Sequence, residues 1–206
     1  MQTLADAIDP RFRAFVLFSA FGTGARSGEC WALRRSSVDL MRREIRIDES
    51  ADEGVIGPTK TGRTRTVRID AETADILAVH MKRYPSKDGF VFSSPEGEIV
   101  RHRNFAGRFF DPARNEVAYL MPKGFVCYDL RHTHASLMFA IGMRAEEVAA
   151  RLGDDVRTVR RWYLHLYEGH DDGTLDRLAE VVRASSAPTM PPREASVMQF
   201  EARAGL

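Results

Sequence analysis

A short block of strand-forming sequence, with helix-forming sequence on both sides, constrains the fold of this 206-residue chain most. In residues 44–49, isoleucines alternate with charged side chains, which is typical of a half-buried strand. Residues 54–70 have the composition of two strands joined by a turn at 60–63. We therefore predict a small antiparallel sheet of about three strands.

The rest of the chain has helical patterns. The first expected helix, residues 11–24, is crowded with Phe, starts after Pro10 and stops at Gly22 and Gly24. A second helix followed by a short turn is expected over 26–40. Further helices are expected near 72–84, 103–118, 129–141, 144–152, 155–167 and 173–184. The predicted fold class is therefore α+β and mostly helical.

Length and composition narrow the class of protein. The length suits one domain, and the shift to Pro, Ser and Ala at Ser185 predicts a domain over 1–184 and a flexible tail over 185–206. No apolar run approaches the roughly 18 residues of a membrane span, and the N-terminus lacks the order of a secretory signal. Cys30 and Cys127 have no metal-like or disulfide-like spacing. We expect a cytoplasmic protein with reduced thiols.

The basic residues are unevenly divided between the two types. Four of the 30 are Lys, which leaves 26 Arg, although the net charge is only +1. Arg is suited to a bidentate grip on phosphate, and a nearly neutral total is compatible with one basic face.

The stretch "GTGARSGE" places Arg26 after a tight turn, at the start of a helix. The helix dipole disfavours an Arg there unless its task is to hold an anion. Glu29 is close enough in sequence to brace Arg26. Taken alone, the stretch is equally well explained as a Gly-rich loop with a surface ion pair.

Two further stretches carry cationic side chains. "PTKTGRTRT" places Lys60 at a hairpin tip, where it either donates a proton, holds a phosphate oxygen or is simply solvated. "YDLRHTHAS" contains Arg131, and two arginines converging on one phosphate would neutralise it. His132 and His134 are two residues apart and point about 200° apart on a helix, so we predict no metal site.

The last stretch, "RLGDDVRTVRRWY", joins two helices. Gly153 ends the first, and Asp154 or Asp155 caps the second. The second helix carries Tyr163, which is either a core aromatic or a nucleophile.

The order of these stretches resembles the tyrosine recombinases, the phage integrase family, from about residue 10 to residue 184. The chain reads T-G-x-R-x-G-E, a strand-borne K-T-G, Y-D-L-R-H-T-H, L-G-D and then a Tyr. The resemblance implies a site-specific recombinase or integrase whose catalytic domain cuts one DNA strand through a 3′-phosphotyrosyl link. It also implies that no metal or other cofactor is required.

The resemblance assigns roles to residues of this sequence. Tyr163 matches the nucleophile, Arg26 and Arg131 match the two arginines that hold the phosphate oxygens, and Lys60 matches the lysine that protonates the leaving 5′-oxygen. Glu29 and His132 match positions that support the catalytic arginines. Four further arginines are expected to contact DNA: Arg63, Arg157, Arg160 and Arg161.

Two catalytic positions depart from the family pattern. Tyr128 stands where the family usually has His, and a phenol is a poorer proton acceptor at neutral pH. Asp154 stands where the family usually has His or Trp. An ionised Asp repels phosphate unless it caps a helix, is protonated or bonds to an Arg. The arginines expected to neutralise it are Arg151, Arg157, Arg160 and Arg161.

The resemblance also implies partners. The expected partners are double-stranded DNA and accessory DNA-bending proteins, but no membrane. The chain is expected to form a homo-tetramer on DNA and to be a monomer when it is free. The apolar tail residues that we expect to dock on a neighbouring protomer are Val197, Met198 and Phe200. Full integrases have N-terminal DNA-binding domains, so an excised catalytic domain or a short relative is expected.

Three alternatives remain at this point. A decayed relative would bind DNA without cutting it, and a type IB topoisomerase-like enzyme would relax supercoils by the same chemistry. A regulator would use residues 144–163 as a helix-turn-helix. The last alternative leaves Arg26 and Lys60 unexplained.

Overall fold

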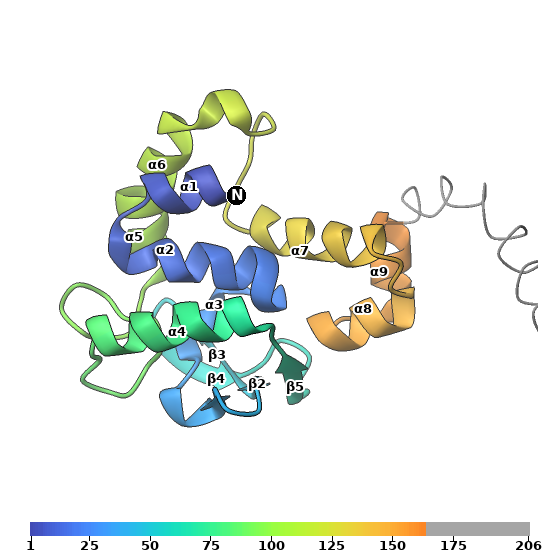
Figure 1. Cartoon of the computed structure of the whole chain (residues 1–206), viewed down its shortest axis with the longest axis horizontal. Helices are drawn as coiled ribbons and strands as arrows, with labels where there is room; N and C mark the ends of the chain where they lie inside the picture. Colours follow the sequence, from blue (N-terminus) through green and yellow to red (C-terminus); the bar gives the residue numbers. More distant parts are fainter. Residues whose placement is uncertain (164–206) are drawn as a thin grey trace, which may run out of the picture. The chain divides into compact units, whose positions relative to one another are not determined.

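The strand-forming block makes two small antiparallel sheets in the computed structural model, which describes residues 1–163 without the side chain of Tyr163 (Figure 1). One sheet has the strand order β1, β2, β5, which are Val38–Asp39, Glu44–Ile47 and Arg65–Arg68. Ile45 lies opposite Val67, and both are buried. Opposite residues of an antiparallel pair share one face, so this face of the sheet packs on the core.

A separate hairpin is formed by β3 (Glu49–Asp52) and β4 (Val55–Pro58). The predicted three-stranded sheet is confirmed, but its third strand is β1, and the expectation that both strands of 54–70 belong to it is wrong. The reason lies in the segment expected as one strand over 44–49. It is interrupted at Asp48, so its two parts pair with different partners, β2 with β5 and β3 with β4.

The first long helix ends at Gly24, one of the two glycines that the sequence indicated, whereas Gly22 lies within its last turn. α2 (Pro10–Leu17) continues as a π-helical turn over Phe18–Thr23, which confirms the helix predicted for 11–24. It stops at Gly24, whose φ of +63° lies in the left-handed region that favours Gly. A Cβ atom on Gly24 would lie 2.6 Å from the side chain of Leu152. Gly24 therefore also allows the helix that contains Leu152 to approach.

The second helix is followed by a turn, as predicted for 26–40. α3 (Ser27–Ala32) begins where expected, and a 3-10 turn over Arg35–Ser37 comes before strand β1. The carbonyl of Leu33 accepts a hydrogen bond from the backbone N–H of Val91 at 2.8 Å. Because this backbone pairs with a distant extended segment, it leaves the helical conformation.

An aromatic core joins these elements. Phe15 stacks on Trp31 with ring centroids 4.3 Å apart, and both are almost fully buried. The helices around this core include α1 (Gln2–Ala7), α4 (Ala71–Arg83), α5 (His102–Phe105) and α6 (Asp111–Glu116). α4 confirms the helix predicted for 72–84, and α5 and α6 with the π-helical turn between them confirm the one for 103–118.

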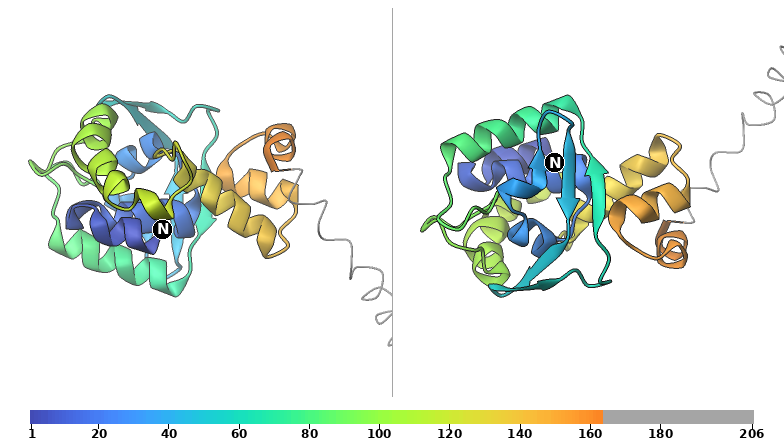
Figure 2. Two further views of the ribbon diagram at one scale, coloured as in Figure 1. Left: turned by 90° about the horizontal axis from the view of Figure 1, so that it is seen from above. Right: turned by 90° about the horizontal axis from the view of Figure 1, so that it is seen from below.

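Three helices carry the last part of the described chain. They are α7 (Asp129–Ala140), α8 (Ala145–Leu152) and α9 (Val156–Tyr163), as predicted, although residues 164–167 of the last predicted helix lie outside the described residues. α7 packs on the π-helical turn that follows α2, and α8 packs on β5 (Figures 1 and 2). The expected helix over 173–184 and the tail lie outside the described residues. Within residues 1–163, no helix is long and apolar enough to cross a membrane.

Candidate active site

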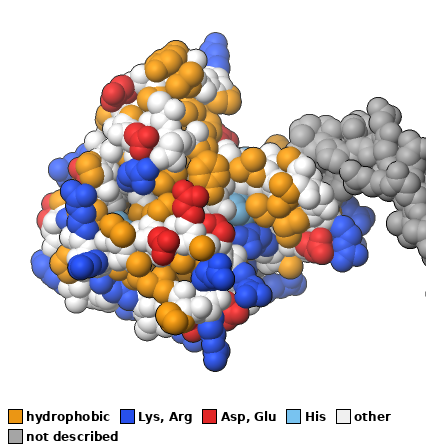
Figure 3. Space-filling view, in the orientation of Figure 1, with side chains coloured by type: hydrophobic (Ala, Val, Ile, Leu, Met, Phe, Trp, Pro, Cys, Tyr) orange, Lys and Arg blue, Asp and Glu red, His pale blue; other side chains and the backbone are white. Residues whose placement is uncertain are grey.

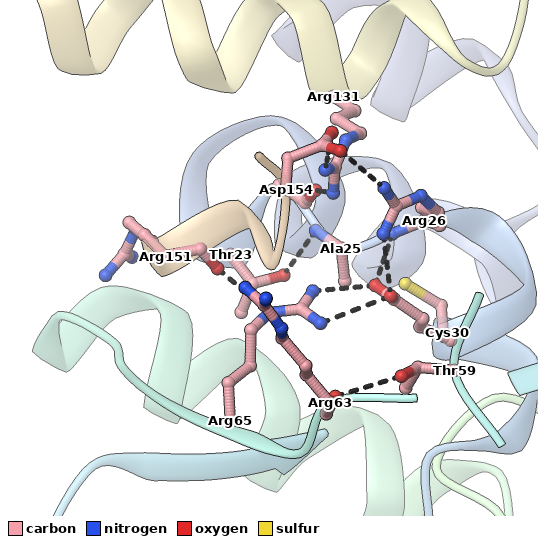
Figure 4. A network of polar contacts seen from close by, with 12 residues as sticks. Thr23, Ala25, Arg26, Cys30, Thr59, Arg63, Arg65, Arg131, Arg151 and Asp154 are labelled. Atoms are coloured by element: carbon pink, nitrogen blue, oxygen red, sulfur yellow. Dashed lines mark hydrogen bonds and ion pairs between the residues drawn. The ribbon is translucent and has the colours of Figure 1, made fainter. Parts of the chain in front are cut away.

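Two arginines that are far apart in sequence meet where α3 and α7 begin (Figure 4). Arg26 directly precedes α3, and its backbone N–H and its Nη1 atom donate to Glu29 at 2.9 and 3.2 Å. Arg131 lies in the first turn of α7, and its Nη1 atom donates to the carbonyl of Gly24 at 2.7 Å. The predicted convergence of Arg26 and Arg131, and the bracing by Glu29, are therefore found in the structure.

The carboxylate of Asp154 lies between these two arginines. Its Oδ1 atom is 3.1 Å from Nη2 of Arg26, and its Oδ2 atom is 2.8 Å from Nη2 of Arg131. The expectation that the arginines of α8 and α9 neutralise Asp154 is wrong. The chain folds so that Asp154 enters between the two clamp arginines, while Asp155 caps α9 by accepting from the backbone N–H of Arg157 at 2.8 Å. We call Arg26, Arg131 and Asp154 the anion clamp.

The clamp is itself braced by an arginine that we did not predict. Arg65, on β5, donates to both carboxylate oxygens of Glu29 at 3.2 and 2.7 Å. Burial opposes ionisation of Glu29, but the hydrogen bonds and charge of Arg65, together with Arg26, outweigh it and lower the pKa of Glu29. The alternation of residues along this strand indicates that Arg65 lies on its buried face. It is two residues before the buried Val67 and therefore points to the same face.

Arg131 is the most buried of the three residues of the anion clamp. Its side chain is 3% exposed. Burial and the positive charge of Arg26 lower the pKa of Arg131, and the hydrogen bond to Asp154 opposes this shift. A buried guanidinium next to a second one requires an anionic partner.

A second set of hydrogen bonds fixes α8 beside the clamp. Arg151 donates to Nε2 of His134 and to the carbonyls of Arg68 and Gly22, at 2.9, 2.9 and 2.5 Å. His134 is fully buried, and burial with the charge of Arg151 lowers its pKa to about 4. A neutral His134 that accepts from Arg151 is thus a structural residue.

Tyr128 and His132 border a pocket of about 100 Å³ beside the clamp, which Arg131, Asp154 and Trp162 also line. The ring of His132 is 5.0 Å from that of Tyr128 and 6.1 Å from that of Trp162. His132 is partly buried, and this burial, with the charge of Arg131, lowers its pKa. An aromatic wall therefore stands next to the two arginines.

The turn between β4 and β5 carries Lys60 and Arg63, both exposed. The hydroxyl of Thr59 donates to the carbonyl of Arg63 at 2.9 Å, and the N–H of Gly62 donates to the carbonyl of Thr59 at 2.8 Å. Lys60 makes no ion pair with any residue of the described part of the chain, and the structure does not bring it into contact with the clamp.

α9 presents its arginines to solvent. The three arginines of this helix that we expect to contact DNA are Arg157, Arg160 and Arg161, and all three are exposed. Arg160 also forms an ion pair with Glu146. Tyr163 is the last residue of α9, and its side chain lies outside the described residues. α8 and α9 form a helix pair, but their connection places Asp154 in the clamp, which the helix-turn-helix alternative does not explain. Figure 3 shows Lys and Arg side chains gathered around β5 and α8.

The geometry is that of an anion-binding site on a partly basic surface. Over residues 1–170, the sequence matches the phage integrase family. The chain belongs to this family. It is 27% identical over 178 residues to the integrase of Staphylococcus phage L54a, a match that covers 78% of this chain and 49% of that protein. The chain thus spans about half the length of this phage integrase.

Solved structures of integrases share the fold. The Tn1549 transposon integrase in complex with transposon right end DNA has a TM-score of 0.68 and 18% identity, over 86% of this chain and 60% of that one. The catalytic domain of the bacteriophage HP1 integrase has a TM-score of 0.60 and 23% identity, over 89% of this chain and 92% of that one. The fold expected from the resemblance is therefore confirmed.

Proposed function

We propose that this chain is the catalytic part of a site-specific DNA recombinase that works through a phosphotyrosine. The observation that carries the proposal is the convergence of Arg26 and Arg131, whose Nη2 atoms lie 3.1 and 2.8 Å from the two oxygens of one anionic group. Two guanidinium groups in this arrangement neutralise the nonbridging oxygens of a phosphodiester and the charge that develops there during displacement.

Tyr163 is the proposed nucleophile. Its phenolic oxygen releases its proton to solvent and forms a bond to phosphorus, and the bond from phosphorus to the 5′-oxygen of the next nucleotide breaks. Lys60 donates a proton to that leaving oxygen, so a free 5′-hydroxyl is released. In the second step, the 5′-hydroxyl of a partner strand attacks the same phosphorus and Tyr163 leaves. Each step exchanges one phosphoester for another, so neither ATP nor a metal is required in this scheme.

The other site residues support this chemistry. Glu29 orients Arg26, and Tyr128 and His132 stand beside the clamp, where each is able to hydrogen-bond a phosphate oxygen. The exposed arginines are proposed to contact DNA phosphates on either side of the cleaved one: Arg63, Arg157, Arg160 and Arg161.

Double-stranded DNA is the proposed substrate, and a tetramer of this chain on DNA, formed from free monomers, is the proposed assembly. The Tn1549 integrase structure with transposon DNA supports the first part. We propose a catalytic domain over 1–184, with the tail 185–206 docking on a neighbouring protomer and accessory DNA-bending proteins assisting. We also propose that the protein acts in the cytoplasm of a bacterial or phage-infected host cell, in association with the nucleoid.

The test traps the covalent intermediate. Duplexes bound by the protein are selected from a random library and rebuilt with a nick beside each candidate cleavage position, so that the freed short strand diffuses away. Wild type and Tyr163→Phe are compared on a denaturing gel, with Tyr119→Phe as the matched control, because Tyr119 is 80% exposed on a turn outside the site.

We expect a covalent band for wild type and Tyr119→Phe and none for Tyr163→Phe. A band that persists in Tyr163→Phe would contradict the assignment of the nucleophile. Specific binding with no band at any nick position would favour the decayed, binding-only relative. Plasmid relaxation without a specific site would favour the type IB topoisomerase-like enzyme.

A further inference from the structure

We propose that Asp154 is an internal substitute for the DNA phosphate: its carboxylate holds the anion clamp closed in the free protein, and the phosphodiester displaces it. The inference rests on the proposed function, because it concerns the same two arginines. It adds a step that the proposed function does not contain, an exchange of one anion for another.

The first argument is the division of contacts at each guanidinium group. Nη1 of Arg26 is held by Glu29 at 3.2 Å, and Nη1 of Arg131 is held by the carbonyl of Gly24 at 2.7 Å. Nη2 of both arginines goes to Asp154, one carboxylate oxygen to each. Removal of the carboxylate would therefore leave both arginines in position, with the two Nη2 atoms available to another pair of oxygens (Figure 4).

The second argument is electrostatic. Arg131 is almost completely buried and lies close enough to Arg26 for the two charges to repel. An empty clamp would keep two poorly solvated positive charges together, so an anion is needed before DNA arrives. A carboxylate retained beside a bound phosphate would instead repel it, so the two anions exclude each other.

The third argument is that the side chain of Asp154 has space to leave the clamp. It lies in the connection between α8 and α9, and its side chain is 20% exposed, whereas that of Glu29 is 1% exposed. Its backbone N–H is bonded to the carbonyl of Ala149 at 3.0 Å, so the main chain is fixed while the side chain borders solvent. The pocket of about 100 Å³ that Tyr128 and Trp162 line adjoins the carboxylate and provides space for its movement.

The test measures thermal unfolding with inorganic phosphate as the probe, at constant ionic strength in chloride. Asp154→Asn removes the charge and keeps the shape. Asp48→Asn is the matched control, because Asp48 forms an ion pair with Arg46 at 3.0 Å away from the clamp. In phosphate-free buffer, we expect Asp154→Asn to melt about 3 °C below wild type. Millimolar phosphate should recover most of this difference, while wild type and Asp48→Asn shift by less than about 1 °C.

A phosphate response in Asp154→Asn that is no larger than that of wild type would overturn the proposal. If Asp154→Asn does not fold, Asp154→Ser takes its place. Isothermal titration calorimetry provides a second measurement: phosphate should bind Asp154→Asn more tightly than wild type, because no carboxylate has to be displaced, and equal or weaker binding to Asp154→Asn would overturn the proposal. None of these readouts needs cleavage, so Tyr163→Phe should respond like wild type even if the proposed reaction is wrong.

Discussion

Glu29 and Asp154 form two halves of one site and differ in how they hold it. Each carboxylate bridges two arginines, and Arg26 is common to both. Glu29 lies inside α3 with a side chain that is 1% exposed, and it joins α3 to β5 through Arg65. Asp154 lies in a connection, and its side chain is 20% exposed. The same chemical group thus acts as a permanent brace in one place and as an exchangeable partner in the other.

The largest effect is expected from the permanent brace. Glu29→Gln keeps the shape of the side chain but leaves Arg65 and Arg26 without their shared negative charge. Breaking a buried ion pair is costly, so we expect the free energy of unfolding to fall by about 3 kcal/mol. Urea titration measures it, with Glu98→Gln as the control, because Glu98 contacts Lys87 at 3.7 Å on the exposed surface. A smaller loss in Glu29→Gln than in Asp154→Asn would reverse the comparison.

The hydrogen bonds that fix α8 predict a pH dependence. The pKa of His134 in the folded protein is about 4, below its usual value of 6.5. Between these two pH values, His134 is protonated in the unfolded chain but neutral in the folded protein. The stability is complete above the unfolded pKa and is lost as pH falls toward the folded one. When the pH falls from about 7 to about 5, the protonation of His134 in the unfolded chain should lower the free energy of unfolding by about 2 kcal/mol.

The pKa of His80 is also lowered to about 4, by burial first, so it adds a similar loss. Urea titrations at several pH values should therefore show a steep acid slope that His134→Gln reduces by about half. An unchanged slope in His134→Gln would mean that the proton is taken up elsewhere.

A smaller effect is expected from the exchangeable half. In phosphate-free buffer, Asp154→Asn should lower the free energy of unfolding by about 1 kcal/mol, because the carboxylate is partly solvated. Phosphate should restore this loss but not the loss in Glu29→Gln. Restoration of both variants by phosphate, or of neither, would remove the distinction between brace and substitute.

The smallest effect is expected at the surface. Arg160 pairs with Glu146 between α9 and α8, but both side chains are exposed to solvent. Water and salt screen such a pair, so Glu146→Gln should leave the melting temperature unchanged within error. A clear loss would show that α9 is held mainly by this contact and not by its apolar face.

Local rules predicted much of the site. The glycines at 24 and 153 adopt positive φ values where the helices end, and Glu29 braces Arg26 three residues away. These features depend on neighbours in sequence, and propensity and spacing are sufficient for them. The fold of the whole domain was instead implied by the resemblance of the ordered motifs to the phage integrase family.

Contacts between distant segments were beyond such rules. Asp154 meets Arg26 and Arg131 because three separate elements close on one point, and charge alone made the arginines of α8 and α9 equally good partners. The three-stranded sheet contains β1 in place of β4, and this strand order likewise depends on pairing with remote backbone. Arg65 was not predicted either, although strand alternation indicates that it shares the buried face of Val67.

The most direct measurement is mass spectrometry of the trapped protein–DNA complex after nuclease and trypsin digestion. Cleavage after Arg161 and Arg177 yields one peptide with two tyrosines, Tyr163 and Tyr167, so fragmentation must distinguish them. We predict a nucleotide attached through phosphate to Tyr163. A nucleotide on Tyr167 instead, or a bound and nicked duplex with no adduct on this peptide, would contradict the central claim that Tyr163 attacks a phosphate held by Arg26 and Arg131.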